Sequence, residues 1–122
     1  MPVIRPETVK AFDAASGELY ENRVLDHLKR FFPQETEALG EARTREEIRY
    51  GIARAKAYSI VSERDVCVYI DVMFTLGRDF DTDARYPWAS EILNDDERWK
   101  PSTKVDLLHK RTIEEIRVAA VK

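Results

Sequence analysis

The spacing of apolar residues along the chain predicts a protein built from helices. Between positions 6 and 32 they recur every three or four residues, which places them on one face of a helix. Pro6 can open such a helix, and Pro33 ends the pattern. Gly17 costs about 1 kcal/mol relative to alanine inside a helix and predicts a bend, a break or a close helix contact at residues 16–17. The apolar positions are Val9, Phe12, Leu19, Val24, Leu25, Leu28, Phe31 and Phe32.

Two helical patterns follow Pro33. The first predicts a short helix over residues 34–39, which Gly40 ends by adopting a left-handed backbone. The second begins at Thr44, which is followed three residues later by Glu47. This is the spacing of a capping box, in which each side chain satisfies the other's free backbone N–H. The inward face of this helix is expected to carry Ile48, Ile52, Ala55 and Tyr58.

The segment from Ser62 to Leu76 predicts the central helix of the fold. Ser62 and Asp65 mark its start, and Gly77 marks its end. Residues 66–76 are apolar on nearly every side, as is typical of a helix surrounded by other helices. The β-branched residues in this run would also suit a strand, but the run is longer than a typical strand and is bounded like a helix.

The last third of the chain predicts an acidic loop and two more helices. The loop covers residues 78–87, and the apolar spacing after it predicts a short helix that ends at residues 94–96. The final helix begins near Pro101 and Ser102, and its core positions are expected to be Val105, Leu108, Ile113, Ile116 and Val121. We therefore predict an all-α, compact single-domain bundle of about five to six helices over residues 1–122.

Composition and charge narrow the classes of function. The chain is 43% hydrophobic and 35% charged, with 4 Gly and 5 Pro, which is typical of a helix-rich globular domain. Its net charge of -3 comes from 23 acidic and 20 basic residues mixed along the whole length. That pattern argues against a nucleic-acid partner, because binding phosphates needs clustered lysines and arginines. No stretch is apolar enough for a signal peptide or a membrane span, so we expect a cytoplasmic protein with no membrane partner.

The residue types that carry catalysis are sparse. The single cysteine, Cys67, excludes an intrachain disulfide and a multi-cysteine metal site, and its apolar neighbours predict a packed, unreactive thiol. His27 and His109 lie on different predicted helices with no nucleophile motif, and no phosphate-binding glycine motif occurs. We therefore expect no enzyme, no catalytic residue, no cofactor and no bound metal.

The acidic loop is the sharpest polar pattern in the chain. Asp79, Asp81 and Asp83 alternate like the opening of a calcium-binding loop. The match fails at Ala84, where the turn needs glycine, and at Ser90, where a bidentate glutamate is needed. A cation site or a small metal-dependent enzyme using this loop stays as an alternative to a solvated loop or one presented to a basic partner.

Aromatic residues next to this loop are candidate interface anchors. Aromatic side chains with a polar group are favoured at protein interfaces, although both tryptophans could instead cap the core. The sequence therefore offers these candidate partner-binding residues: Asp79, Asp81, Asp83, Tyr86, Trp88 and Trp99.

Four short stretches carry a resemblance to a known group of proteins. They are IRYGIARA at 48–55, SERDVC at 62–67, LGRDFD at 76–81 and PWA at 87–89. The sequence resembles small bacterial proteins encoded beside the PAAR-tip and effector genes of type VI secretion systems, over most of its length. No catalytic motif is carried over from that group.

The resemblance implies a small binding protein that takes part in toxin delivery. One role is an accessory or chaperone that holds an effector or tip protein, and the other is an immunity protein that neutralises a cognate toxin. The modest net charge gives little support to immunity by phosphate mimicry, which favours the accessory role. An apolar stripe on the first or last helix would also suit a homodimer.

Overall fold

The computed structural model describes residues 15–121, and within this range the chain is helical and contains no strand. The elements are α2 (Gly17–Phe31), α3 (Pro33–Ala57), α4 (Glu63–Leu76), η1 (Phe80–Thr82), α5 (Pro87–Leu93) and α6 (Pro101–Val121). This confirms the predicted compact all-α fold of five to six helices. The predicted helix start at Pro6 and the positions Val9 and Phe12 lie outside the described residues.

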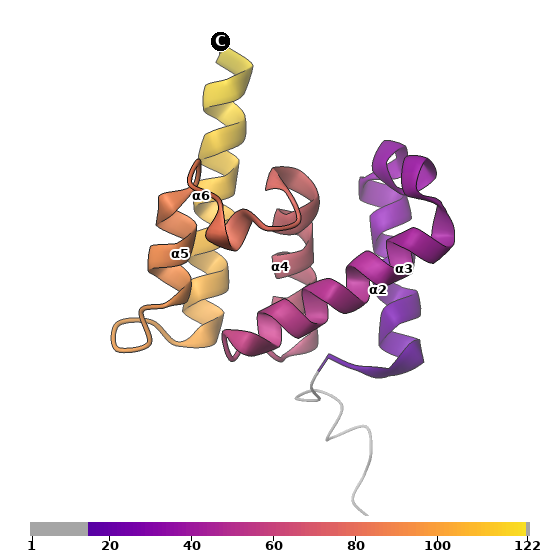
Figure 1. Ribbon diagram of the computed structural model, residues 1–122, viewed down its shortest axis with the longest axis horizontal. Helices are drawn as coiled ribbons and strands as arrows, with labels where there is room; N and C mark the ends of the chain where they lie inside the picture. Colours follow the sequence, from indigo (N-terminus) through magenta and orange to yellow (C-terminus); the bar gives the residue numbers. More distant parts are fainter. Residues whose placement is uncertain (1–14, 122) are drawn as a thin grey trace, which may run out of the picture.

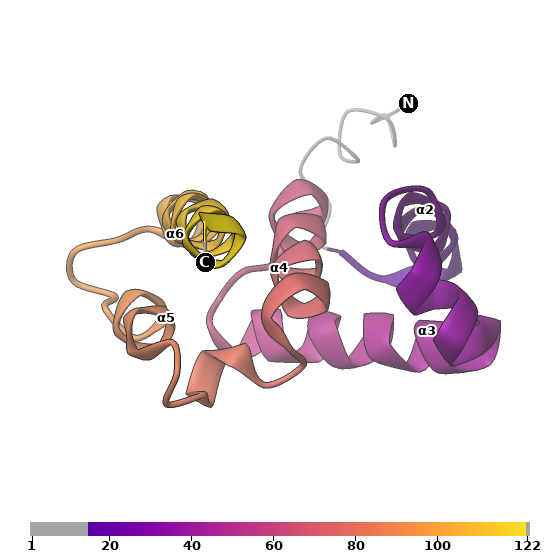
Figure 2. The same cartoon turned by 90° about the horizontal axis from the view of Figure 1, so that it is seen from above.

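Helix α4 lies at the centre of the bundle, as its apolar sequence predicted. It packs against α3, α6, α2 and η1. Figure 2 shows α2 and α6 on either side of α4, with α3 running across beneath. Tyr69 and Ile70 of α4 are completely buried, and Phe74 of the same helix is half-buried against the core. The whole core is therefore organised around this one helix.

Both ends of α4 follow local sequence signals. The Ser62 hydroxyl accepts a hydrogen bond from the Asp65 backbone N–H at 3.3 Å, which satisfies one free donor of the first turn. Gly77, at a φ of 127°, ends the helix with a backbone conformation that side-chain-bearing residues rarely adopt. The boundaries predicted for this helix are confirmed.

Two other glycines also act where the sequence placed a break. Gly17 has a φ of 83° and opens α2 directly after Ser16, so the predicted break at residues 16–17 is confirmed. Gly40 has a φ of 82° and a ψ of 164°, and it divides α3 into two helical parts. The short helix predicted before Gly40 is therefore the first part of α3 (Figure 1).

The capping box predicted at Thr44 is wrong. Thr44 lies one turn inside the second part of α3, is fully buried, and donates its hydroxyl hydrogen to the Gly40 carbonyl oxygen at 2.8 Å. Glu47 instead accepts a hydrogen bond from Arg78 Nε at 3.1 Å. The non-helical backbone of Gly40 sets the start of this helical part, so the Thr44 hydroxyl is free to bond back along the helix.

The prediction for the inward face of α6 is right in its first half and wrong in its second. Val105 and Leu108 are fully buried, whereas Ile113 is 37% and Ile116 50% exposed. The C-terminal end of α6 extends past the ends of α4 and α5 (Figure 1), and Ile113 and Ile116 line an open pocket instead of the core. The side chain of Val121 lies outside the described residues.

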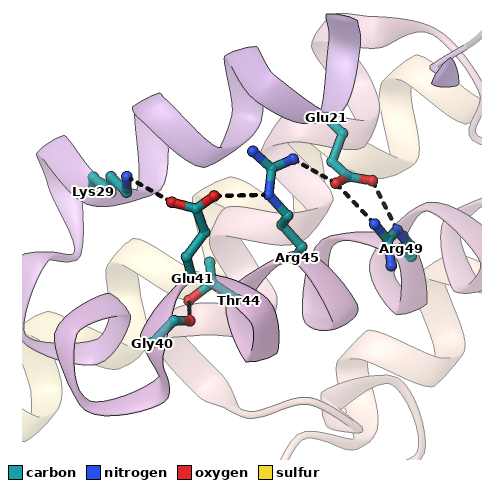
Figure 3. Close-up of polar contacts among 7 residues, drawn as sticks. All are labelled: Glu21, Lys29, Gly40, Glu41, Thr44, Arg45 and Arg49. Atoms are coloured by element: carbon teal, nitrogen blue, oxygen red, sulfur yellow. Dashed lines mark hydrogen bonds and ion pairs between the residues drawn. The ribbon is translucent and has the colours of Figure 1, made fainter. Parts of the chain in front are cut away.

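A polar network fastens α2 to the second part of α3 (Figure 3). The Glu21 carboxylate accepts hydrogen bonds from Arg45 at 2.6 Å and from Arg49 at 2.8 and 3.1 Å. Glu41 accepts from Arg45 at 3.3 Å and from Lys29 at 3.5 Å. Hydrogen bonds from Arg49 and then Arg45 hold the pKa of Glu21 below its ordinary value. The network thus depends on an ionised Glu21.

None of the helices within residues 15–121 has the length and apolar character needed to cross a lipid bilayer.

Candidate functional site

An open groove of about 320 Å³ runs between α2 and α6, with α4 as its floor. Over the described residues α2 and α6 do not pack against each other, because α4 separates them (Figure 2). The polar residues that line it are His27, Asp71, Thr75, His109 and Thr112. The apolar ones are Phe31, Phe32, Val72, Ile113 and Ile116. We call this feature the α2–α6 groove.

Both walls of the α2–α6 groove present large apolar side chains to solvent. Phe31 is 61% exposed, and Ile113 and Ile116 are the exposed residues of α6 described above. Six large hydrophobic side chains in the described part of the chain are exposed, and these three of them line the same groove. Covering such a surface releases about 25 cal/mol per Å² of apolar area, so a contiguous exposed patch is typical of an interaction site.

The floor of the groove carries an interhelical histidine–carboxylate pair. His27 Nε2 on α2 lies 2.8 Å from Asp71 Oδ1 on α4. Burial raises the pKa of Asp71 above its ordinary value, while His27 and, more weakly, His109 act in the opposite direction. Both side chains keep about 30% of their surface exposed, so the pair can be reached from the groove.

Cys67 lies one helical turn before Asp71 on the same face of α4. Its side chain is half-buried rather than fully packed. Burial, followed by the negative charge of Asp71, raises the pKa of the Cys67 thiol to about 11. The thiol is therefore protonated at neutral pH, in agreement with the prediction of an unreactive cysteine, because an activated nucleophile needs a lowered pKa.

The structure does not present Asp81 on a solvated acidic loop. Phe80 and Asp81 lie in η1 and are fully buried against the core. The Asp81 carboxylate pairs with Arg54 and accepts a hydrogen bond from the Tyr58 hydroxyl at 2.6 Å. The expectation of a solvated loop is wrong at this residue, because burial of Phe80 draws its neighbour inward and Arg54 compensates the charge.

The other two loop carboxylates engage different partners. Asp79 accepts a hydrogen bond from the Tyr50 hydroxyl, and Asp83 pairs with Arg85 at 2.7 Å. Within residues 15–120 the three loop carboxylates do not form a group with the geometry of a cation site. Each carboxylate has its own protein partner instead.

The aromatic candidates lie at different depths. Trp88 is only 7% exposed, and its Nε1–H donates to Glu115 Oε1 at 3.3 Å, so this tryptophan packs in the core. Tyr86 and Trp99 are half-buried. Tyr86 packs edge-on against Trp88 with ring centroids 5.9 Å apart. These residues therefore leave less accessible aromatic surface than the sequence suggested.

The sequence did not connect the residues of the α2–α6 groove with one another, although His27 and His109 were weighed as catalytic candidates. His27 and Asp71 are 44 positions apart, so no local spacing connects them. One available signal was Asp71 itself, an acidic residue inside an otherwise apolar central helix. A buried or half-buried charge in such a place usually has a partner on a neighbouring element.

No protein-family model, curated protein or solved structure matches this chain. The function of the protein is therefore inferred from its own residues and their geometry.

Proposed function

We propose that this chain is a non-catalytic protein-binding domain that holds a helix of a partner protein in the α2–α6 groove. The observation that carries the proposal is the joint exposure of Phe31, Ile113 and Ile116 along one groove. In a chain of this size, large apolar side chains left in solvent on one face favour a protein partner that covers them.

The geometry favours a helical occupant. Two helices held apart over a third leave a trough into which the apolar face of another helix can pack. Ile113 and Ile116 are three residues apart on α6, so they form one ridge along the groove. A partner helix would place its apolar residues on this ridge and on Phe31, and a polar side chain could hydrogen-bond to Asp71 or His109 on the polar side.

The polar side chains support binding rather than catalysis. The pKa of the Cys67 thiol is raised, and the Nε2 atom of His27 is engaged by Asp71. Each carboxylate of the acidic loop also has its own partner, which weighs against a metal-dependent enzyme built on that loop.

The resemblance of the sequence supports a more specific partner. It favours a type VI secretion effector or tip protein held by this chain in the cytoplasm. An immunity protein that neutralises a cognate toxin is the second role of the same class, and it would use the same surface.

The test is affinity purification of the tagged chain from its native host, followed by mass spectrometry of the retained proteins. The test variant is Ile113→Asp combined with Ile116→Asp. The matched control is Val118→Asp, because Val118 is also on α6 and 54% exposed but does not line the groove. We expect the wild type and the Val118 variant to retain one stoichiometric partner, and the double variant to lose at least roughly 100-fold in affinity.

Retention of the same partner by all three proteins would contradict the groove as the binding surface. Recovery of the chain alone, or only as a complex with itself, would contradict a foreign partner. Once a partner is identified, its toxicity in cells that lack this chain separates the two roles. Toxicity that the chain suppresses indicates immunity, and a harmless partner that becomes unstable without the chain indicates an accessory or chaperone.

A further inference from the structure

Three side chains of different chemistry meet where α2 packs against α4. They are an imidazole nitrogen of His27, the thiol sulfur of Cys67 and a carboxylate oxygen of Asp71, and these atoms all lie within 4.8 Å of one another. Within the part of the chain that the structure describes, this is the one such gathering of three histidine, cysteine or acidic side chains. All three are half-buried, so they are held by packing yet remain accessible.

We propose that His27, Cys67 and Asp71 bind a divalent transition-metal ion of the zinc class. This inference does not depend on the proposed binding of a partner helix.

The backbone already places the three donors close to binding geometry. Cys67 and Asp71 are four residues apart on α4, so their side chains project from the same face one turn apart. His27 approaches from α2, which packs against α4. The ion would therefore link two helices whose positions are set by the core.

The distances require only small side-chain movements. Zinc binds imidazole nitrogen and carboxylate oxygen at about 2.0–2.2 Å and thiolate sulfur at about 2.3 Å, so tetrahedral ligand atoms lie roughly 3.3–3.6 Å apart. The 2.8 Å contact between His27 and Asp71 would open by roughly half an ångström as the ion replaces the shared proton. The sulfur lies within 4.8 Å and would close by up to about 1.3 Å.

The donor set selects the type of ion. Thiolate and imidazole favour zinc, cobalt and copper over magnesium and calcium, which prefer oxygen ligands. On binding, the Cys67 thiol loses its proton to solvent and the proton shared by His27 and Asp71 is displaced as well, so ion binding releases protons. Three protein ligands leave the fourth position to water, on the side from which the α2–α6 groove reaches His27 and Asp71.

A nucleophilic cysteine is the main alternative use of these three residues. Such a cysteine donates its hydrogen to the histidine, and the carboxylate binds the other nitrogen of the ring. In the described structure the Asp71 carboxylate accepts the hydrogen bond of His27 Nε2, and Cys67 makes no hydrogen bond to the ring. The arrangement suits coordination better than proton transfer.

The test is a cobalt(II) titration of the reduced full-length chain, followed by displacement with zinc. We expect one equivalent of cobalt to produce a thiolate-to-cobalt charge-transfer band and the visible absorption of a tetrahedral ion, both lost when zinc is added. Zinc at about a hundred times its dissociation constant should raise the melting temperature by roughly 10 °C, because it binds only the folded chain. A titration with no charge-transfer band would overturn the proposal.

Substitutions assign the ligands. Cys67→Ser should abolish the charge-transfer band, and His27→Gln and Asp71→Asn should each weaken zinc binding by about 100-fold or more. His109→Gln is the matched control, because His109 lines the same groove but lies outside the three-residue group. The zinc affinity of the His109→Gln variant should stay within about threefold of that of the wild type. Equal losses in the His27 and His109 variants, with both still folded by circular dichroism, would overturn the assignment.

The two hypotheses fail separately. The titration uses the metal ion alone, so its result does not depend on whether the chain binds a partner protein. The Ile113 and Ile116 double variant should keep the metal affinity of the wild type, because it changes none of the three ligands.

Discussion

The Asp81 carboxylate is completely buried and pairs with the guanidinium of Arg54, whose side chain is 34% exposed. Asp81 in turn raises the pKa of Arg54 above its ordinary value. Burial, followed by the hydrogen bond to Asp81, raises the pKa of Tyr58 to about 12. The aspartate is therefore an internal tether between η1 and α3, although its sequence context is that of a surface loop.

Asp81→Asn is expected to lower the free energy of unfolding by about 2–4 kcal/mol. The substitution keeps the size of the side chain but removes the charge that compensates Arg54, and the partial exposure of Arg54 moderates the cost. Urea denaturation measures the loss. The control is Asp83→Asn, which removes an exposed pair with Arg85 and should cost less than about 1 kcal/mol. Equal losses of unfolding free energy in the two variants would show that burial of the Asp81–Arg54 pair adds nothing to stability.

Gly51→Ala is expected to destabilise the fold by about 1–3 kcal/mol through overpacking. A methyl group at this position would lie 2.7 Å from Cγ1 of Ile70 and 3.0 Å from Sδ of Met73, where α3 crosses α4. Thermal unfolding checks this result. In the double variant with Ile70→Ala the two losses should sum to more than the measured loss, because the second change makes room for the methyl group. Strict additivity would place the cost elsewhere than in this contact.

Lys104→Met is expected to lower the free energy of unfolding by about 1–3 kcal/mol. The Lys104 ammonium is buried, donates to the Leu93 carbonyl oxygen at 2.8 Å and pairs with Asp96, so its loss leaves a carbonyl at the end of α5 without a partner. Methionine retains most of the apolar stem, which isolates the polar contribution. Lys110→Met, at an exposed site on the same helix, should change stability by less than about 0.5 kcal/mol in the same chemical denaturation.

Glu21 is expected to make stability depend on pH in the acidic range. Arg49 and Arg45 lower its pKa in the folded chain below the ordinary value of 4.5, so the unfolded chain binds the proton more tightly. The contribution of ionised Glu21 to the free energy of unfolding is complete above pH 4.5, and it is lost as the pH falls through the lower pKa of the folded chain. Glu21→Gln should therefore be less stable than the wild type at neutral pH and converge with it in acid. A constant difference across that pH range would contradict the role assigned to the network in Figure 3.

The amino-acid sequence by itself determined the helices and most of their ends. The signals at Ser62, Gly77, Gly40 and Pro101 act within one turn of the chain, because capping bonds and restricted backbone angles depend only on nearby residues. The apolar run of α4 also identified the centre of the core, since a helix that is apolar all round must be surrounded by others. All-α architecture therefore followed from local patterns.

Only the tertiary structure decided which polar and apolar side chains face solvent in the second half of the chain. Burial of the Asp81 carboxylate depends on its pairing with Arg54. The contact between His27 and Asp71 joins two residues that are 44 positions apart and lie on different helices. Ile113 and Ile116 have the spacing of core residues, but they line the open α2–α6 groove and stay exposed. Helical spacing gives the side of a helix on which a residue lies, and the packing of distant elements decides what covers that side.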